Sequence, residues 1–107
     1  MRYYCGIDLG GTKIYSILCD SSGKIIARKK IKTQASSGFD AVFENIVTCY
    51  AELLKKSEIV DDEVEKIGLA VPSAVNTATG MLLDACNLGW KNVPLARMLS
   101  ERLKKPV

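Results

Sequence analysis

The sequence of 107 residues contains no histidine, one tryptophan and three prolines, and its four cysteines are widely spaced. Without histidine the chain cannot form a serine–histidine–aspartate triad, and it lacks the most common ligand of catalytic zinc sites. No two cysteines form a Cys-x-x-Cys pair, so we expect free, mostly buried thiols in a reducing compartment. We therefore predict no zinc site in this chain.

Long hydrophobic runs are also missing. No apolar stretch approaches the roughly 18 residues of a membrane helix, and the first residues lack the features of a secretory signal. We therefore expect a cytoplasmic protein without a membrane partner. Fifteen basic and twelve acidic residues leave a net charge of +3, which is too small and too dispersed to predict nucleic-acid binding. The basic residues 28–32 fit the solvent-exposed face of a strand.

The first half of the chain predicts three strands and a helix. Residues 3–9, 14–19 and 24–32 are β-favouring segments separated by turns, which indicates a three-stranded antiparallel meander. Ser37 and Asp40 have the spacing of a capping box, and the apolar stripe that follows predicts a helix ending near residue 56.

The second half predicts a further strand, a hairpin and a helix. The acidic residues 61–65 are expected to form a solvated connector, and the apolar run 66–71 fits a strand buried on both faces. Residues 73–84 are rich in turn formers and predict a hairpin. Asn92 is expected to cap a last helix whose buried stripe contains Leu95, Met98, Leu99 and Leu103.

The resulting order lacks the parallel strand that normally follows a strand and its crossover helix. We therefore expect residues 1–107 to form one lobe of a longer protein, with the next strand beginning near Val107. A complete small domain is the alternative.

A glycine turn at Gly10-Gly11-Thr12 follows the first strand and carries the strongest chemical signal. Glycines allow backbone N–H groups to approach phosphate oxygens, Thr12 adds a hydroxyl donor, and Lys13 can offset charge. Asp8 would repel a phosphate directly, so it fits such a site only as a ligand of Mg²⁺, often through water. A tight hairpin turn without a ligand is the alternative on these residues alone.

Asp8-Leu9-Gly10-Gly11-Thr12-Lys13 resembles the first phosphate motif of the sugar kinase, heat-shock chaperone and actin superfamily. The segment 67–76, with Thr79-Gly80 and Asn87-Leu88-Gly89-Trp90, resembles the ROK family of bacterial repressors and sugar kinases, including glucokinases. The resemblance spans nearly the whole chain. It implies an α/β fold of the ribonuclease H-like, actin-like ATPase type, in which the antiparallel meander is continued by parallel strands with helices packed on the sheet.

The resemblance also implies ATP and Mg²⁺ as cofactors and transfer of the γ-phosphoryl group to a sugar hydroxyl. It assigns Asp8 to the Mg²⁺ site, through water, and Gly10, Gly11, Thr12 and Lys13 to the ATP phosphates. Ser73, Ala74 and Asn87 are assigned to the sugar. Ser73 stands where the family usually has glycine. The resemblance therefore does not predict which sugar is bound.

We assign no catalytic residue within this chain, because the family's aspartate base and its second lobe lie further along. The leading hypothesis is therefore the N-terminal lobe of a ROK-type sugar kinase for a hexose or N-acetylhexosamine, with the isolated chain inactive. A sugar-sensing repressor lobe is the alternative, although only seven residues precede Asp8 and repressors of this type carry a DNA-binding segment there. The expected partners are a nucleotide, a sugar and the missing C-terminal lobe, and a homo-oligomer is compatible with an unpaired sheet edge.

Overall fold

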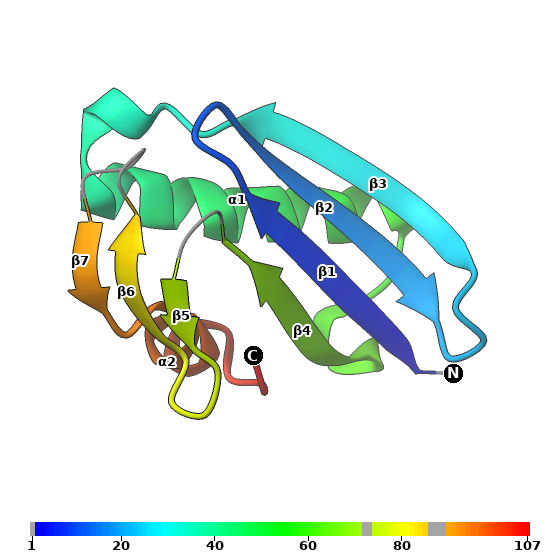
Figure 1. Ribbon diagram of the computed structural model, residues 1–107. Coiled ribbons are helices and arrows are strands. Elements are labelled where there is room, and N and C mark those ends of the chain that lie inside the picture. Colours follow the sequence, from blue (N-terminus) through cyan, green and yellow to red (C-terminus); the bar gives the residue numbers. More distant parts are fainter. Residues whose placement is uncertain (1, 72–73, 86–89) are drawn as a thin grey trace.

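The computed structural model describes residues 2–71, 74–85 and 90–107. The structure is an α/β fold with a four-stranded mixed sheet, a three-stranded sheet and two α-helices (Figure 1). The elements follow one another as β1 (Tyr3–Leu9), β2 (Lys13–Asp20), β3 (Ile25–Lys32), α1 (Phe39–Ser57), β4 (Val64–Ala70), β5 (Ala74–Asn76), β6 (Met81–Ala85), β7 (Trp90–Val93) and α2 (Leu95–Leu103).

The larger sheet has the strand order β3-β2-β1-β4, with β1 in an inner position. Strands β1, β2 and β3 pair antiparallel in sequence, and β4 pairs with β1 in parallel. This arrangement confirms the predicted meander continued by a parallel strand. Because β1 and β4 are parallel, their carboxyl ends lie at the same edge of the sheet.

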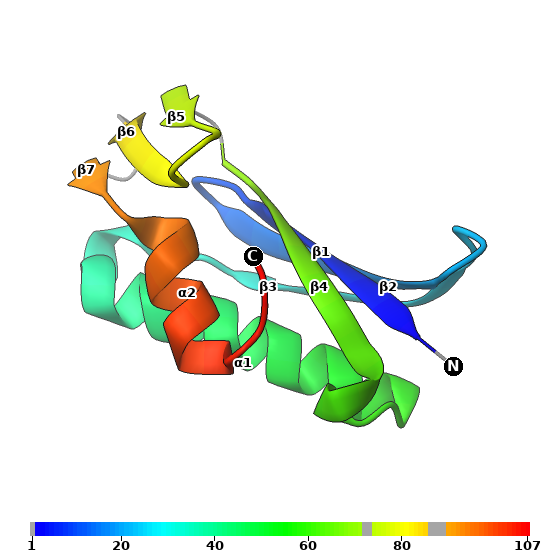
Figure 2. The ribbon, with the colours of Figure 1, turned by 90° about the horizontal axis from the view of Figure 1, so that it is seen from below.

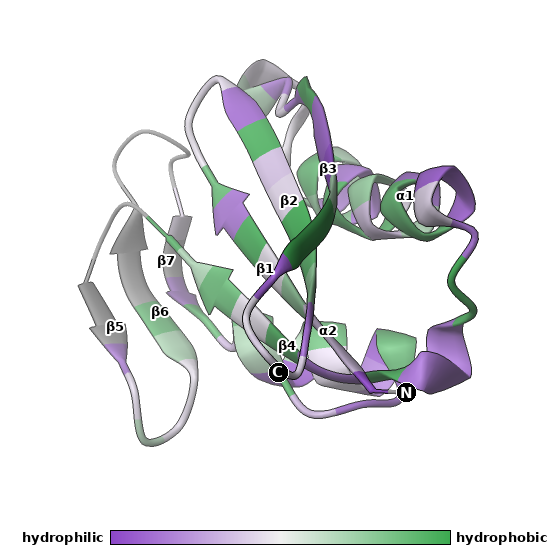
Figure 3. Ribbon diagram, turned by 90° about the vertical axis from the view of Figure 1, so that its right-hand side faces the viewer, coloured by the Kyte–Doolittle hydropathy of each residue, from purple (hydrophilic) through white to green (hydrophobic). Residues whose placement is uncertain are grey.

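The core lies on one face of this sheet. Along β1, the side chains of Cys5, Ile7 and Leu9 are buried while Asp8 is exposed. Helices α1 and α2 lie on the same side of the sheet (Figure 2), and hydrophobic and hydrophilic residues alternate along the strands (Figure 3). In the described residues, neither helix is long and apolar enough to cross a membrane.

The prediction that the strand after the acidic segment is buried on both faces is wrong. Val64 and Ile67 are buried, whereas Glu65, Lys66, Gly68 and Ala70 are exposed. The reason is that the helices cover only one face of the sheet in the described part of the chain. The predicted exposed face of the basic strand is confirmed, because Arg28, Lys30 and Lys32 are exposed on β3.

The predicted capping box at Ser37 and Asp40 is wrong. Ser37 belongs to a 3-10 turn, η1 (Ala35–Ser37), and the residue that caps α1 is Gly38 with φ 94°. A positive φ of this size favours glycine, which lets the chain leave the turn and enter the helix at once. Asp40 lies in the first turn of α1, where a negative charge suits the helix dipole.

The predicted hairpin is present as β5 and β6, and β7 adds a third strand that was not predicted. Asn92 does not cap the last helix. It lies within β7 with φ 53°, and Pro94 is the residue that precedes α2. The Trp90 side chain is buried in the core, and its ring meets that of Phe39 edge-on at 4.8 Å.

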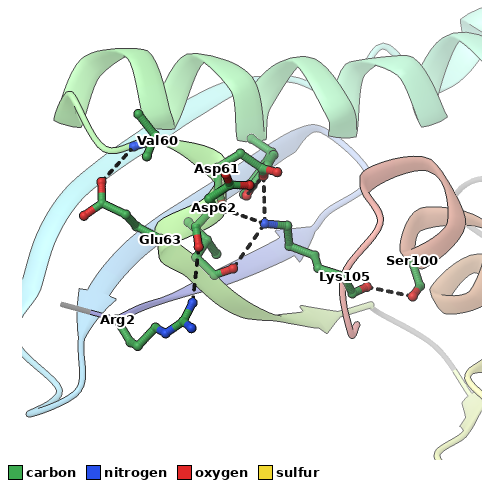
Figure 4. Close-up of polar contacts among 9 residues, drawn as sticks. Arg2, Val60, Asp61, Asp62, Glu63, Ser100 and Lys105 are labelled. Atoms are coloured by element: carbon green, nitrogen blue, oxygen red, sulfur yellow. Dashed lines mark hydrogen bonds and ion pairs between the residues drawn. The ribbon is translucent and has the colours of Figure 1, made fainter.

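The acidic connector is more than a solvated loop, because Asp61 belongs to a cluster of polar contacts that we call the lysine cluster (Tyr50, Asp61, Val64 and Lys105). Lys105 Nζ donates to the Asp61 carboxylate at 2.8 Å and to the carbonyls of Asp61 and Val64 at 2.7 and 3.1 Å. Figure 4 shows Lys105 reaching this site from the segment after α2. The Tyr50 hydroxyl donates to the same carboxylate.

Two further hydrogen bonds hold the chain after α2 in place. Ser100 Oγ donates to the Lys105 carbonyl at 2.7 Å, and the amide of Ile67 on β4 donates to the Pro106 carbonyl at 3.0 Å. The last residues of the chain therefore lie alongside β4, on the side opposite β1.

Candidate phosphate site

The glycine turn lies at the carboxyl end of β1, between β1 and β2. Asp8 and Leu9 are the last residues of β1 before the turn, and Lys13 begins β2. The side chains of Asp8, Thr12 and Lys13 are exposed, while Gly10 and Gly11 are half-buried. The structure thus brings together in one place the residues predicted for phosphate and magnesium.

Asp8 lies on the face of the sheet that the two helices leave open. It stands opposite Tyr15 on β2 and Ala70 on β4. A groove of about 450 Å³ runs over this face and is lined by Gly6, Ile7, Asp8, Tyr15, Ile17, Gly68, Leu69 and Ala70. Gly68 lies on its floor, and nothing lies within 4 Å of the position that a Cβ of Gly68 would take, so a ligand can approach the backbone of β4 there. At Gly6 the Ile17 side chain already lies 3.3 Å from that position.

Gly10 is required by a close approach of the backbone. Its amide donates to the Lys13 carbonyl at 2.9 Å, and a Cβ at this position would lie 2.8 Å from the same carbonyl oxygen. Any larger residue would therefore push the two arms of the turn apart. This is a steric reason for glycine that does not depend on a ligand.

Two residues that the sequence analysis did not single out hold the turn, and we call them the threonine clamp (Thr33 and Asn45). Thr33, directly after β3, donates from its hydroxyl to the Gly10 carbonyl at 2.7 Å and from its amide to the Thr12 carbonyl at 2.9 Å. Asn45 Nδ2, on α1, donates to the Thr33 carbonyl at 3.0 Å. The sequence signal that could have pointed to this contact is Asn45, a polar residue beside the apolar stripe of the helix.

Two amides of the turn have no hydrogen-bond partner among the described residues. In the part of the chain that the structure describes, no group accepts a hydrogen bond from the amides of Gly11 or Thr12. Successive N–H groups of this kind can bind an anion, and the Thr12 hydroxyl and Lys13 ammonium can add to them. Asp8 carries a carboxylate, which is a kind of ligand that Mg²⁺ takes in proteins.

The structure describes only one of the three residues predicted to contact the sugar. Ser73 and Asn87 lie outside the described residues. Ala74 is described in its backbone and stands opposite Asp84 in the β5–β6 pair. Their assignment to the sugar therefore stays a prediction.

The cysteines described are not reactive groups of this site. Cys5 and Cys49 are buried, and Cys5, Cys19 and Cys49 are free thiols, as predicted. Burial is the main cause that raises the pKa of the Cys5 thiol to about 12, with the neighbouring Cys49 and Cys19 adding to the effect. Such a thiol stays protonated at neutral pH and is a poor nucleophile. Cys86 lies outside the described residues.

Comparison with known proteins identifies the family of the chain. Residues 4–107 match the model of the ROK family. A glucokinase of Halalkalibacterium halodurans is 31% identical over 106 residues, covering 99% of this chain and 32% of that protein. A putative xylose repressor of Caldicellulosiruptor sp. is 31% identical over 102 residues, covering 95% of this chain and 26% of that protein.

A solved structure gives the same result for the fold. The ROK family glucokinase of Streptomyces griseus, in complex with glucose and AMPPNP, superposes with a TM-score of 0.84 at 26% identity, covering 98% of this chain and 31% of that chain. The chain thus spans between about a quarter and a third of the length of these relatives.

Proposed function

Because the chain belongs to the ROK family, we propose that it is the N-terminal, phosphate-binding lobe of a longer sugar kinase. The reaction is transfer of the γ-phosphoryl group of ATP to a hydroxyl of a hexose or N-acetylhexosamine. The observation that carries the proposal is the glycine turn with unpartnered amides, placed directly after the strand that presents Asp8.

The residues of the turn fit what phosphoryl transfer requires of a protein, which is mainly positioning and stabilisation of charge. The amides of Gly11 and Thr12 would hold phosphate oxygens, and Lys13 would balance part of their charge. Bound Mg²⁺ would neutralise charge on the phosphates. Asp8 fits as the residue that would hold this ion through water, because Mg²⁺ prefers oxygen ligands and keeps several of its waters.

We place the general base and the sugar-binding second lobe outside this chain. Ser73, Ala74 and Asn87 are proposed to contribute part of the sugar surface from this lobe. The chain alone is accordingly expected to bind Mg·ATP weakly and to show no turnover.

The proposal is tested with Asp8→Asn in the longer protein. We expect loss of Mg²⁺-dependent ATP turnover with an unchanged unfolding temperature, because Asp8 is exposed and makes no core contact. Asp62→Asn is the matched control, since Asp62 is also exposed but lies before β4, at the opposite end of the sheet. Turnover by Asp8→Asn close to the wild-type rate would refute the role of Asp8.

The similarity to xylose repressors supports a second candidate, a lobe that senses a sugar without phosphorylating it. The two candidates differ in the nucleotide. A kinase binds Mg·ATP and consumes it when sugar is added, whereas a sensor binds sugar without consuming ATP. Calorimetry with ATP and a panel of sugars, followed by an assay of ADP release, distinguishes them.

A further inference from the structure

We propose that Thr33 is a positioning residue of the phosphate site, which sets the direction of the amide groups in the glycine turn. The inference rests on the proposed function, because it names a residue that acts on the phosphate-binding amides without touching the phosphate. Thr33 lies 23 residues from Gly10 in the sequence, on a different strand connection.

Peptide geometry is the first step of the argument. In a trans peptide the carbonyl of one residue and the N–H of the next point in opposite directions. Thr33 binds the Gly10 carbonyl through Oγ1 and the Thr12 carbonyl through its amide. Each bond draws a carbonyl toward Thr33, so the N–H groups of Gly11 and Lys13 face away from it.

The closure of the turn is the second step. In a hydrogen-bonded four-residue turn, the carbonyl of the first residue accepts from the amide of the fourth. Here that carbonyl belongs to Gly10 and takes the Thr33 hydroxyl at 2.7 Å. The described structure contains no bond to it from the Lys13 amide. The Thr33 hydroxyl therefore holds the Gly10 carbonyl in place of the usual closing bond of the turn.

The rigidity of Thr33 is the third step. Its side chain is fully buried, and its carbonyl accepts the Asn45 side chain from α1. The helix on the core side is thus connected through Thr33 to the turn on the ligand side. All groups in this connection are neutral, so it places no charge next to a bound anion.

The test compares Thr33→Val, Thr33→Ser and the control Thr48→Val, which makes the same chemical change at an exposed position of α1. Loss of one hydrogen bond corresponds to about a tenfold weaker affinity for Mg·ATP in Thr33→Val, while Thr33→Ser stays within about twofold of wild type. Hydrogen exchange of the amides of residues 10–13 is measured on the same proteins without nucleotide. We expect faster exchange in Thr33→Val alone.

In the longer kinase, Thr33→Val should raise KM for ATP and leave KM for the sugar unchanged, which a merely structural role would not do. Wild-type affinity together with wild-type exchange in Thr33→Val would overturn the inference. If wild type binds no Mg·ATP, the proposed function fails, and the exchange rates still decide whether Thr33 orders the turn. If Thr33→Val does not fold, Asn45→Ala replaces it, with the same direction expected in both measurements and the same result overturning the proposal.

Discussion

The threonine clamp and the lysine cluster hold the chain at opposite ends of the four-stranded sheet, and they are built from different kinds of group. The clamp consists of Thr33 and Asn45 bonded to backbone carbonyls, and every member is neutral. In the lysine cluster the Asp61 carboxylate accepts from both the Lys105 ammonium and the Tyr50 hydroxyl. Both connect segments that are distant in the sequence, so charge is not required for that purpose.

The difference fits the proposed phosphate site at one end and has an electrostatic consequence at the other. A charged group at the clamp would either compete with an anion in the glycine turn or repel it, whereas neutral donors do neither. No ligand is proposed at the lysine cluster, so an ion pair can hold the two chain segments together there. Its contribution then depends on pH, because one member is a carboxylic acid.

The pKa values in the lysine cluster follow from its contacts. Burial opposes ionisation of Asp61, but hydrogen bonds from Lys105 and Tyr50 outweigh it and lower the pKa of its carboxyl group below the usual 3.8. Burial is the main cause that raises the pKa of the Tyr50 hydroxyl, and its bond to Asp61 adds to this.

The largest change in stability is expected for Lys105→Met. The Lys105 side chain is only 7% exposed. Its removal takes the cation from the Asp61 carboxylate and one donor each from the carbonyls of Asp61 and Val64, although the Asp61 carbonyl keeps its bond from the Val64 amide. We expect a loss of about 2–3 kcal/mol in the free energy of unfolding at neutral pH. Urea denaturation measures it, with the exposed Lys55→Met as control. Equal free energies of unfolding for both variants would show that the lysine cluster does not stabilise the fold.

A smaller change is expected for Asn45→Ala in the threonine clamp. The Thr33 carbonyl loses one neutral hydrogen bond, which corresponds to about 1 kcal/mol. Because no charge is involved, the loss should be the same at pH 4 and pH 7. A loss that varies with pH in this range would contradict the neutral character of the clamp.

The dependence of the free energy of unfolding on pH below about 4 also distinguishes the lysine cluster from the threonine clamp. A carboxyl group with a lowered pKa in the folded state adds stability above its unfolded pKa, and this stability is lost as pH falls through the folded value. Wild type should therefore lose this contribution below about pH 4, starting near the ordinary pKa of 3.8. In Asp61→Asn this component should vanish, whereas Asn45→Ala should keep it. An identical dependence on pH in wild type and Asp61→Asn would refute the assignment.

The smallest effect is expected for Arg102→Ala. Arg102 binds both oxygens of the Glu44 carboxylate on α1, but both side chains are about half exposed. Exposed ion pairs contribute little to stability and are weakened by salt. We expect an unfolding temperature indistinguishable from wild type at high salt, measured by circular dichroism. A clear decrease in the unfolding temperature of Arg102→Ala at high salt would show that this surface pair stabilises the fold as the lysine cluster does.

Much of the fold was predictable because it depends on local sequence patterns. The β-favouring runs separated by turns specify β1, β2 and β3, and the apolar spacing of residues 42–54 specifies α1. The glycine turn was predictable because Gly10-Gly11-Thr12 stands between two β-favouring runs, and the turn does lie between β1 and β2. Its binding of phosphate and the role of Asp8 stay predictions.

What could not be predicted depends on contacts between distant residues or on backbone geometry. The Thr33 hydroxyl reaches Gly10 only once β3 has paired with β2, and no spacing in the sequence announces this contact. The start of α1 was misplaced by one residue because Ser37 is a common cap, while Gly38 is chosen by its φ of 94°. Asn92 was misplaced because β7 is short and its pairing with β6 outweighs a local capping preference.

The inner position of β1 has a consequence for how the chain folds during synthesis. Strand β1 can pair with β2 as soon as the glycine turn has formed, but its other edge pairs with β4, which begins at Val64. That edge therefore stays open until more than fifty further residues have left the ribosome. An apolar strand with an open edge is a site for pairing with other chains. The strand that carries Asp8 is thus among the first made and among the last completed, and a nascent chain stalled before β4 would be prone to aggregate.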